Sequence, residues 1–237
     1  MLRIAVCDDE EKFLSVFSNS IEELIEKNGY DMTLSSYSNV SLFLNEHESS
    51  AFDIVFLDIE MPELGGFQCV ERLRKFNEDV IIIFVSNHES YVFHSFVFRP
   101  FRFIRKSRFY NELEEALDSS AAHYYEKNRV YNVASEVGMV SVNLTDIRYF
   151  DVYSHNVFMH MKDKKLLVKK SLKEVEDELA SLGFIRIHKS YLVSFRYIYF
   201  IQTNSITLVN MEKLPMSKHR AKDVKEKMIY FTKRFED

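Results

Sequence analysis

Five polar residues in the first half of the chain have the types and positions that phosphoryl chemistry needs: Asp8, Asp9, Asp58, Ser86 and Lys106. Each follows a short apolar run, so each is expected at the end of a strand. Three neighbouring carboxylates repel one another unless a cation neutralises them, and Mg²⁺ accepts such oxygen ligands. Asp58 could then attack a phosphoryl group, while the cation and Lys106 offset the charge on its oxygens and Ser86 hydrogen-bonds one of them.

Residues 1–127 show alternating strand and helix patterns. Short apolar runs predict strands at 2–7, 32–37, 53–57, 80–85 and 101–104, and helical spacing predicts helices from residue 9 onward and at 41–48, 65–76, 91–98 and 110–127. Five strands alternating with five helices indicate an α/β, doubly wound, five-stranded parallel sheet. Ligands bind such sheets at the carboxyl ends of the strands, so the five polar residues are expected to converge there.

The stretch 91–103 is unusually aromatic. Core packing is expected to account for Phe93, Phe96 and Phe103. Not every ring can face inward, however, and an exposed remainder would suit a partner surface.

The pattern changes after a polar segment at 126–134, which is predicted to be a linker. Alternating and apolar runs predict strands at 139–144, 157–162, 165–169, 184–188, 198–202 and 205–209. Ser171 and Glu174 carry the capping-box signature of a helix, and Ser217 is expected to cap the last one. Residues 135–237 are therefore predicted to form a mainly-β domain.

The formal net charge of −5 is the sum of an acidic half and a basic half. Residues 1–127 hold 12 Lys and Arg against 23 Asp and Glu, a balance of −11, whereas residues 128–237 hold 19 against 13, a balance of +6. A basic half indicates a polyanionic partner. The composition, with 46% hydrophobic residues and only 5 Gly and 3 Pro, excludes disordered and collagen-like chains.

Cysteine usage and hydropathy bear on the compartment. The two cysteines lack disulfide-framework or zinc-site spacing. Four charged or titratable residues interrupt the longest apolar run, 184–201, which excludes an ordinary membrane span there. We therefore expect a reduced, cytoplasmic protein without a membrane partner.

Cationic polar clusters, rather than a catalytic set, stand out in the second half. They lie at 154–156, 188–190 and 218–220, with Arg196 nearby, and no HExxH or GxSxG pattern is present. Lys and Arg neutralise phosphates, and His, Asn and Arg also reach base edges. For any one cluster alone, a solvated basic surface is the alternative interpretation.

The segments CDDE, IVFLDIEMPELGGF, IIIFVSNH and FRFIRKS resemble the receiver domain of two-component response regulators, in order and spacing over about residues 1–125. The resemblance implies that Asp58 is the phosphoacceptor. It also implies that Asp8, Asp9 and Asp58, with the backbone carbonyl of Glu60, hold Mg²⁺.

The same resemblance assigns the switch residues: Ser86 is the hydroxyl, Phe103 the aromatic residue and Lys106 the phosphate contact. Ser107 stands where receivers often have proline, which leaves the geometry of that peptide bond open. In receivers the aromatic stretch changes on phosphorylation and often dimerises, so a homodimer of the phosphorylated protein is expected.

The segments DIRYFDVYSHNVFMHMKDKK, KKSLKEVEDEL, LGFIRIHKSYLVSFRYI and LPMSKHRAKDVKE resemble the LytTR-type DNA-binding domain, with Ser194 where Asn is usual. The resemblance implies a small all-β fold whose loops and strand edges enter major grooves of double-stranded promoter DNA. The DNA contacts that it implies are base readers His155, Lys189 and His219, their neighbours Lys218 and Arg220, and the weaker phosphate candidates Arg186 and Arg196.

Together the halves are similar to a LytTR-type response regulator, not an enzyme: a receiver at 1–125, a linker at 126–134 and a DNA-binding domain at 135–237. A sensor histidine kinase would phosphorylate Asp58 to control transcription. One alternative is a DNA-binding regulator whose receiver dimerises without phosphorylation. Another, a Mg²⁺-dependent phosphatase of the aspartyl-nucleophile type, is disfavoured because Asp58-Ile59-Glu60 replaces the D-x-D motif.

Overall fold

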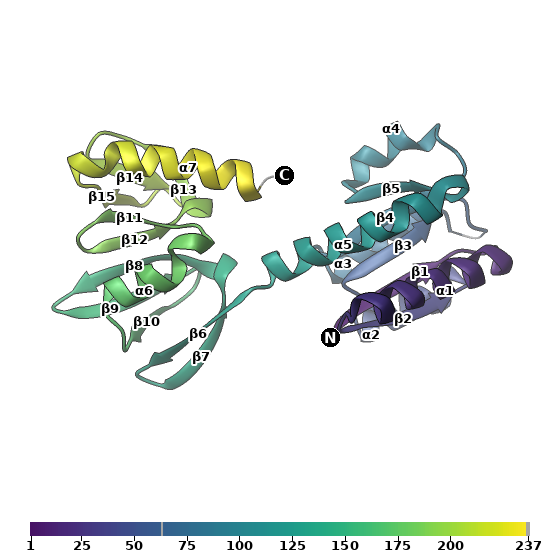
Figure 1. Ribbon diagram of the computed structural model, residues 1–237, viewed down its shortest axis with the longest axis horizontal. Helices are drawn as coiled ribbons and strands as arrows, with labels where there is room; N and C mark the ends of the chain where they lie inside the picture. The colour runs from purple at the N-terminus through teal and green to yellow at the C-terminus, as the bar shows by residue number, and fades with distance from the viewer. Residues whose placement is uncertain (63, 236–237) are drawn as a thin grey trace. The chain divides into compact units, whose positions relative to one another are not determined.

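The computed structural model describes residues 1–62 and 64–235 (Figure 1). Glu63, within the quoted receiver motif, and the last two residues of the expected second domain lie outside the described residues. The chain divides into two compact units, Met1–Glu126 and Lys127–Asp237. No helix among the described residues is long and apolar enough to cross a membrane.

The first unit is built on a five-stranded parallel sheet in the order β2-β1-β3-β4-β5, as the sequence predicts. Its strands are β1 (Leu2–Cys7), β2 (Met32–Tyr37), β3 (Ile54–Asp58), β4 (Ile81–Ser86) and β5 (Arg102–Arg105), and its helices are α1 (Glu11–Asn28), α2 (Val40–Ser49), α3 (Gly66–Phe76), α4 (Tyr91–Ser95) and α5 (Phe109–Lys127).

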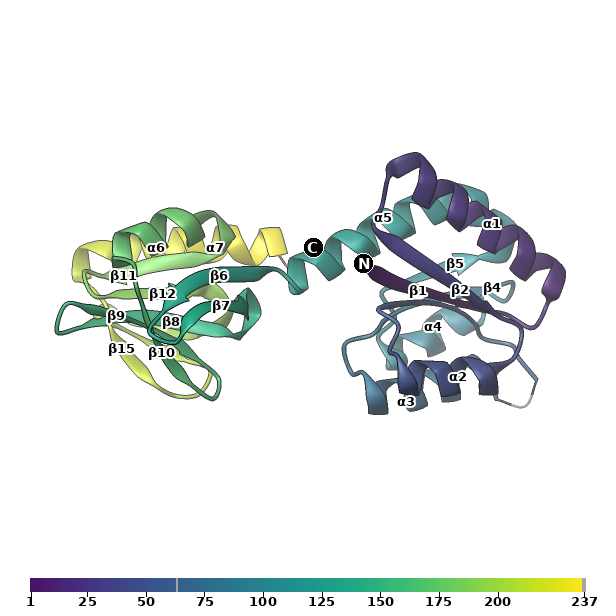
Figure 2. The same cartoon turned by 90° about the horizontal axis from the view of Figure 1, so that it is seen from below.

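Helices cover both faces of this sheet (Figure 2). Phe17 of α1 and Leu117 of α5 belong to the core on one face, and Phe43 of α2 and Leu73 of α3 to the core on the other. Every residue of β3 and β4 is buried, because parallel strands covered on both faces are continuous apolar runs. The strand order reverses between β1 and β3, so their carboxyl ends flank the crevice where such folds bind ligands.

The short helix α4 corrects one prediction. Phe93 and Phe96, expected in the core, are 82% and 63% exposed, whereas Phe103 is half-buried. The opposite side of the segment faces inward: the Phe98 ring stacks on that of Phe67 with a centroid distance of 4.7 Å. The regular helix also ends at Ser95, three residues earlier than expected, and a 3-10 turn follows.

The second unit is mainly antiparallel β structure, also as predicted. A seven-stranded sheet has the order β11-β12-β8-β9-β10-β6-β7, and a smaller sheet has the order β13-β14-β15. The elements are β6 (Val130–Ser135), β7 (Gly138–Asn143), β8 (Ile147–Tyr153), β9 (Asn156–Met161), β10 (Lys165–Val168), α6 (Leu172–Leu179), β11 (Phe184–His188), β12 (Tyr191–Ser194), β13 (Ile198–Ile201), β14 (Ser205–Leu208), β15 (Lys213–Pro215) and α7 (Ala221–Phe235).

Two helices complete this unit. Val175 of α6 lies in a core with residues of the larger sheet, and Val224 of α7 lies in a second core with residues of the smaller sheet. The predicted capping box is present: Ser171 Oγ accepts the Glu174 N–H at 3.2 Å, and Glu174 Oε2 accepts the Ser171 N–H at 2.8 Å. The prediction for Ser217 is wrong, because its side chain makes no capping hydrogen bond.

Three strands depart from the sequence-based expectation. Helix α5 continues to Lys127 and β6 begins at Val130, so strand occupies most of the expected linker. Strands β8 and β12 had no prediction, because neither shows a clean alternation of buried and exposed residues.

Replacing Gly66 by alanine is expected to destabilise the protein, because a Cβ atom there would overlap the Asp58 carbonyl oxygen and lie 2.9 Å from Ile59 Cα. We expect a loss of about 1–3 kcal/mol in the free energy of unfolding, measured by urea denaturation. Gly65→Ala is the matched control, since the nearest atom to its Cβ would be 3.6 Å away. Equal stabilities of the two variants would contradict this packing argument.

Candidate functional site

Three charged side chains, those of Asp8, Asp58 and Lys106, meet at the carboxyl edge of the parallel sheet. Asp58 ends β3, Asp8 follows β1 and Lys106 follows β5. The Lys106 Nζ atom lies 2.6 Å from Asp8 Oδ2 and 2.7 Å from Asp58 Oδ2, and its side chain is only 8% exposed. Residues that are 50 and 98 positions apart in sequence thus form one buried ion-pair network.

Burial dominates the electrostatics of these carboxylates. It raises the pKa of Asp8 to about 6 and also raises the pKa of Asp58, and the hydrogen bonds from Lys106 offset this only in part. For Lys106, burial alone would lower the pKa, but the hydrogen bonds and charges of the two carboxylates outweigh it and raise the pKa. The site therefore concentrates negative charge that a single ammonium group does not fully balance.

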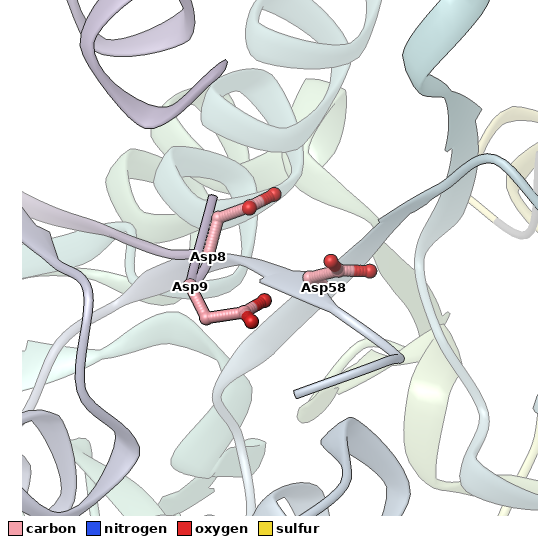
Figure 3. A group of neighbouring side chains, drawn as sticks. All are labelled: Asp8, Asp9 and Asp58. Atoms are coloured by element: carbon pink, nitrogen blue, oxygen red, sulfur yellow. The ribbon is translucent and has the colours of Figure 1, made fainter. Parts of the chain in front are cut away.

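The donor set fits a hard divalent cation. Carboxylate oxygens of Asp8, Asp9 and Asp58 all lie within 4.8 Å of one another, and Figure 3 shows the three side chains as neighbours, with those of Asp8 and Asp9 directed toward Asp58. Asp9 is exposed, so one side of the cluster opens to solvent. Mg²⁺ commonly combines one or two carboxylates with water and phosphate oxygens, and this arrangement provides both the carboxylates and the open side.

The neighbouring strand ends carry the other predicted residues of this site. Asp58 pairs with Val85, so Ser86 is the next residue along β4; it is buried, and its Oγ accepts the His88 N–H at 3.2 Å. Phe103 of β5 pairs with Phe84, one strand further along the sheet. The structure therefore places Ser86 at the same edge as the carboxylates and Phe103 in the adjoining strand.

Glu60 has contacts that the sequence did not indicate. Its backbone N–H donates to Asp58 Oδ1 at 3.2 Å. Its carboxylate accepts the Tyr91 hydroxyl at 3.1 Å and lies 2.9 Å from His88 Nε2. The loop after Asp58 is thus connected to the start of α4, through pairs that no sequence motif marks.

Lys106 also contacts an aromatic ring, and its peptide bond to Ser107 has the ordinary geometry. Its Nζ atom lies 4.7 Å from the centroid of the Phe13 ring, a cation–π contact that the sequence did not predict. No peptide bond among residues 1–62 and 64–235 is cis, so the bond between Lys106 and Ser107 is trans.

In the second unit, the predicted base readers and their neighbours gather at one end of the larger sheet, whereas Arg196 follows the opposite end of β12. His155 lies in a two-residue turn between β8 and β9, where Tyr153 pairs with Asn156 and both turn residues have positive φ. The turn that contains Lys189 is adjacent, because the Ser190 carbonyl accepts the Val152 N–H at 3.0 Å. Both His155 and Lys189 are exposed.

The third cluster joins the same end of the sheet. The Ser217 N–H donates to the Ile187 carbonyl at 3.0 Å, and Arg220 Nη1 donates to the Arg186 carbonyl at 3.2 Å. A register irregularity between Arg186 and His188 marks this part of β11. Lys218 and His219, both exposed, therefore lie beside the Lys189 turn, and three separate sequence segments form one basic edge.

The two weaker phosphate candidates differ. Arg196 is exposed, and its guanidinium lies 5.1 Å from the Phe195 ring. The Arg186 side chain is 12% exposed, and its guanidinium donates to protein carbonyls and to Glu176. The structure therefore directs Arg186 inward, away from the orientation that the sequence prediction required.

Two protein families together match most of the chain. The response regulator receiver domain matches residues 4–118, and the LytTr DNA-binding domain matches residues 138–229. The sensory transduction protein LytT of Bacillus subtilis is 24% identical over 245 residues, which cover 95% of this chain and 98% of LytT. The transcriptional regulatory protein LytR of Staphylococcus aureus (strain N315) is 22% identical over 244 residues, covering 94% and 98%.

Solved structures match the two units separately. The response regulator protein TrrA of Thermotoga maritima, in complex with Mg²⁺-BeF, is 26% identical with a TM-score of 0.45, covering 51% of this chain and 99% of TrrA. A LytTr DNA-binding domain of a response regulator from Bacillus cereus is 22% identical with a TM-score of 0.38, covering 42% and 95%. From the two domain matches and the full-length relatives, this chain is a two-component response regulator with a receiver domain followed by a LytTR DNA-binding domain.

Proposed function

We propose that the protein controls transcription through phosphorylation of Asp58 by a sensor histidine kinase in the cytoplasm. The observation that carries this proposal is the placement of Lys106 Nζ between Asp8 and Asp58 beside an open acidic cluster. A carboxylate oxygen of Asp58 attacks the phosphorus of a phosphohistidine. The new O–P bond forms as the P–N bond breaks, and the electron pair leaves with the imidazole of the kinase.

Each residue of the site has a separate role in this transfer. Asp8, Asp9 and Asp58, with the Glu60 carbonyl, would hold Mg²⁺, which when bound supplies positive charge to the phosphoryl oxygens. Lys106 adds a second positive charge at the buried side of the site. The phosphorylated Asp58 then offers oxygens that can accept a hydrogen bond from the Ser86 hydroxyl, whose oxygen accepts the His88 N–H.

Acetyl phosphate with Mg²⁺ should label the wild-type chain, and Asp58→Asn should abolish the label because the amide is a far poorer nucleophile than a carboxylate. Removal of Mg²⁺ by EDTA should abolish it too. Phosphate-affinity gels measure the label. Asp79→Asn is the matched control, because this exposed aspartate precedes β4 at the other end of the strand. Equal labelling of Asp58→Asn would show that another residue accepts the phosphoryl group.

We further propose that phosphorylation favours a homodimer through an exposed apolar surface, defined as Phe93, Phe96 and Val97. These three apolar side chains are 82%, 63% and 74% exposed. Phe93 also lines a hollow with Phe103 and Arg105, so a movement of the switch aromatic would alter the surface directly. Contiguous apolar residues of this kind are typical of interaction sites.

Phe93→Ser is expected to weaken the dimer of the phosphorylated protein by about 1 kcal/mol or more, because it removes an aromatic anchor. Sedimentation equilibrium with and without acetyl phosphate measures the dissociation constant. Phe76→Ser is the control, since Phe76 is 53% exposed at the end of α3, outside this surface. A dimer that tolerates Phe93→Ser as well as Phe76→Ser would point to a different interface.

For DNA recognition we propose the basic edge, defined as the segments 154–155, 189–190 and 218–220. His155, Lys189 and His219 would read bases, while Lys218 and Arg220 contact bases or phosphates beside them and Arg196 contacts phosphate. A dimer brings two such edges to repeated promoter sites, and the second contact then benefits from a high effective concentration.

His155→Ala and Lys189→Ala should each weaken binding to promoter DNA by roughly 1–3 kcal/mol and relax the sequence preference, as expected for the loss of one base contact. Fluorescence anisotropy with preferred and scrambled duplexes measures both effects. Lys162→Ala is the matched control, because this exposed lysine lies in the β9–β10 turn at the opposite end of the sheet. Unchanged affinity and preference would remove the substituted residue from the set of base readers.

A further inference from the structure

Arg186 on β11 is almost fully engaged within the protein. Its Nε donates to the His188 carbonyl at 2.7 Å, and its Nη2 donates to the Lys189 carbonyl. Its Nη1 donates to the Leu172 carbonyl at 3.3 Å and to Glu176 Oε2 at 2.9 Å. Four of the five N–H donors of a guanidinium group are thereby used.

These bonds surround the turn that carries Lys189. Two acceptors, the carbonyls of His188 and Lys189, belong to the turn itself, and the other two belong to α6. Within the turn, His188 Nδ1 accepts the Ser190 N–H at 3.2 Å. Arg186 therefore fastens the β11–β12 turn to α6, which is packed on the larger sheet.

The same geometry disfavours a direct contact between Arg186 and DNA phosphate. The side chain is 12% exposed, and contact with a phosphate would require it to give up bonds to backbone carbonyls and to Glu176. Breaking the ion pair with Glu176 would leave the guanidinium charge without its partner at a largely buried position. Lysine could not replace this residue in full, because an ammonium group lacks the planar fork that reaches several carbonyls at once.

We propose that Arg186 is a positioning residue for sequence readout: it fixes the backbone of the Lys189 turn against α6 and does not itself touch DNA. This inference rests on the proposed DNA-binding function of the basic edge. Base readout requires the reading group to be held within about 0.5 Å of its productive position. The Arg186 bonds to the His188 and Lys189 carbonyls add to the Val152–Ser190 hydrogen bond in fixing the backbone of this turn. Glu176, as the charged acceptor for Arg186, contributes to the same positioning.

The test compares Arg186→Gln and Glu176→Gln in the full-length protein, each alone and combined with Lys189→Ala. The probes are a duplex that the wild-type chain enriches from a randomised pool, and a scrambled duplex of the same composition. Anisotropy titrations over a range of NaCl concentrations give the specificity ratio and the salt slope, and thermal unfolding reports whether each variant is folded. Asp177→Asn is the matched control for loss of an exposed acidic residue on α6.

We expect Arg186→Gln and Glu176→Gln each to lower the specificity ratio about tenfold, comparable to one lost base contact. The salt slope should stay at the wild-type value, and neither substitution should add to the effect of Lys189→Ala, because the residues act as one unit. Removing an acidic side chain near DNA ordinarily strengthens binding. A lower specificity ratio in Glu176→Gln, but not in Asp177→Asn, is therefore specific to positioning. If Arg186→Gln fails to fold, Glu176→Gln alone decides.

Three results would overturn the inference. A salt slope reduced by about one unit in Arg186→Gln would identify a direct phosphate contact. An unchanged specificity ratio in both variants would contradict the positioning role. So would double variants in which the effect of Arg186→Gln or Glu176→Gln on the specificity ratio adds in full to that of Lys189→Ala. Failure of the wild-type chain to enrich any sequence would instead overturn the proposed function.

Discussion

The receiver unit depends on one ammonium group shared by two buried carboxylates. Lys106 meets Asp8 and Asp58 at the ends of three different strands, so the pairing requires all three strands to be in register. Without Lys106, two buried like charges would face each other in a medium of low dielectric constant, where charge repulsion is strong. With Lys106 present, negative charge remains in excess, which is the condition for attracting a cation and then a phosphoryl group.

The DNA-binding unit differs in where its charges lie. The proposed DNA contacts Lys189 and Lys218 are exposed, so buried acids do not fix them in place. They lie instead in short turns held by backbone hydrogen bonds, such as those from Val152 and Ser217. Arg186, a largely buried cation of this unit, donates hydrogen bonds to the carbonyls of the neighbouring turn. In the receiver unit, the buried Lys106 is part of the site itself. In the DNA-binding unit, the proposed role of Arg186 is to support the turn that carries Lys189.

The sequence predicted the first unit better than the second for a physical reason. Parallel strands buried on both faces are continuous apolar runs, so β3 and β4 were evident and the polar residues after them defined the site. The five-residue helix α4 is too short for its periodicity to separate an inner from an outer face, so Phe93 and Phe96 were assigned wrongly to the core. Strand β12 was missed because its residues do not alternate between buried and exposed.

The role of Arg186 was not accessible from sequence, because its acceptors are backbone carbonyls that only the fold brings together. Resemblance to a family could indicate that Arg186 is a basic residue near the expected DNA surface. It could not predict the direction in which the side chain points. The same holds for the contacts of Glu60 with His88 and Tyr91.

The tight turn at the tip of β8 and β9 has a consequence for how readily DNA preference can diverge. Ser154 and His155 have φ values of 48° and 69°, a conformation that β-branched side chains avoid and that Asn, Asp, His and Gly tolerate. Where this turn is kept, a change of DNA preference through position 155, a proposed base reader, therefore favours a few residue types, most of them hydrogen-bonding. The backbone of this hairpin thus sets a limit on the evolutionary repertoire of the reader, independently of any base that it meets.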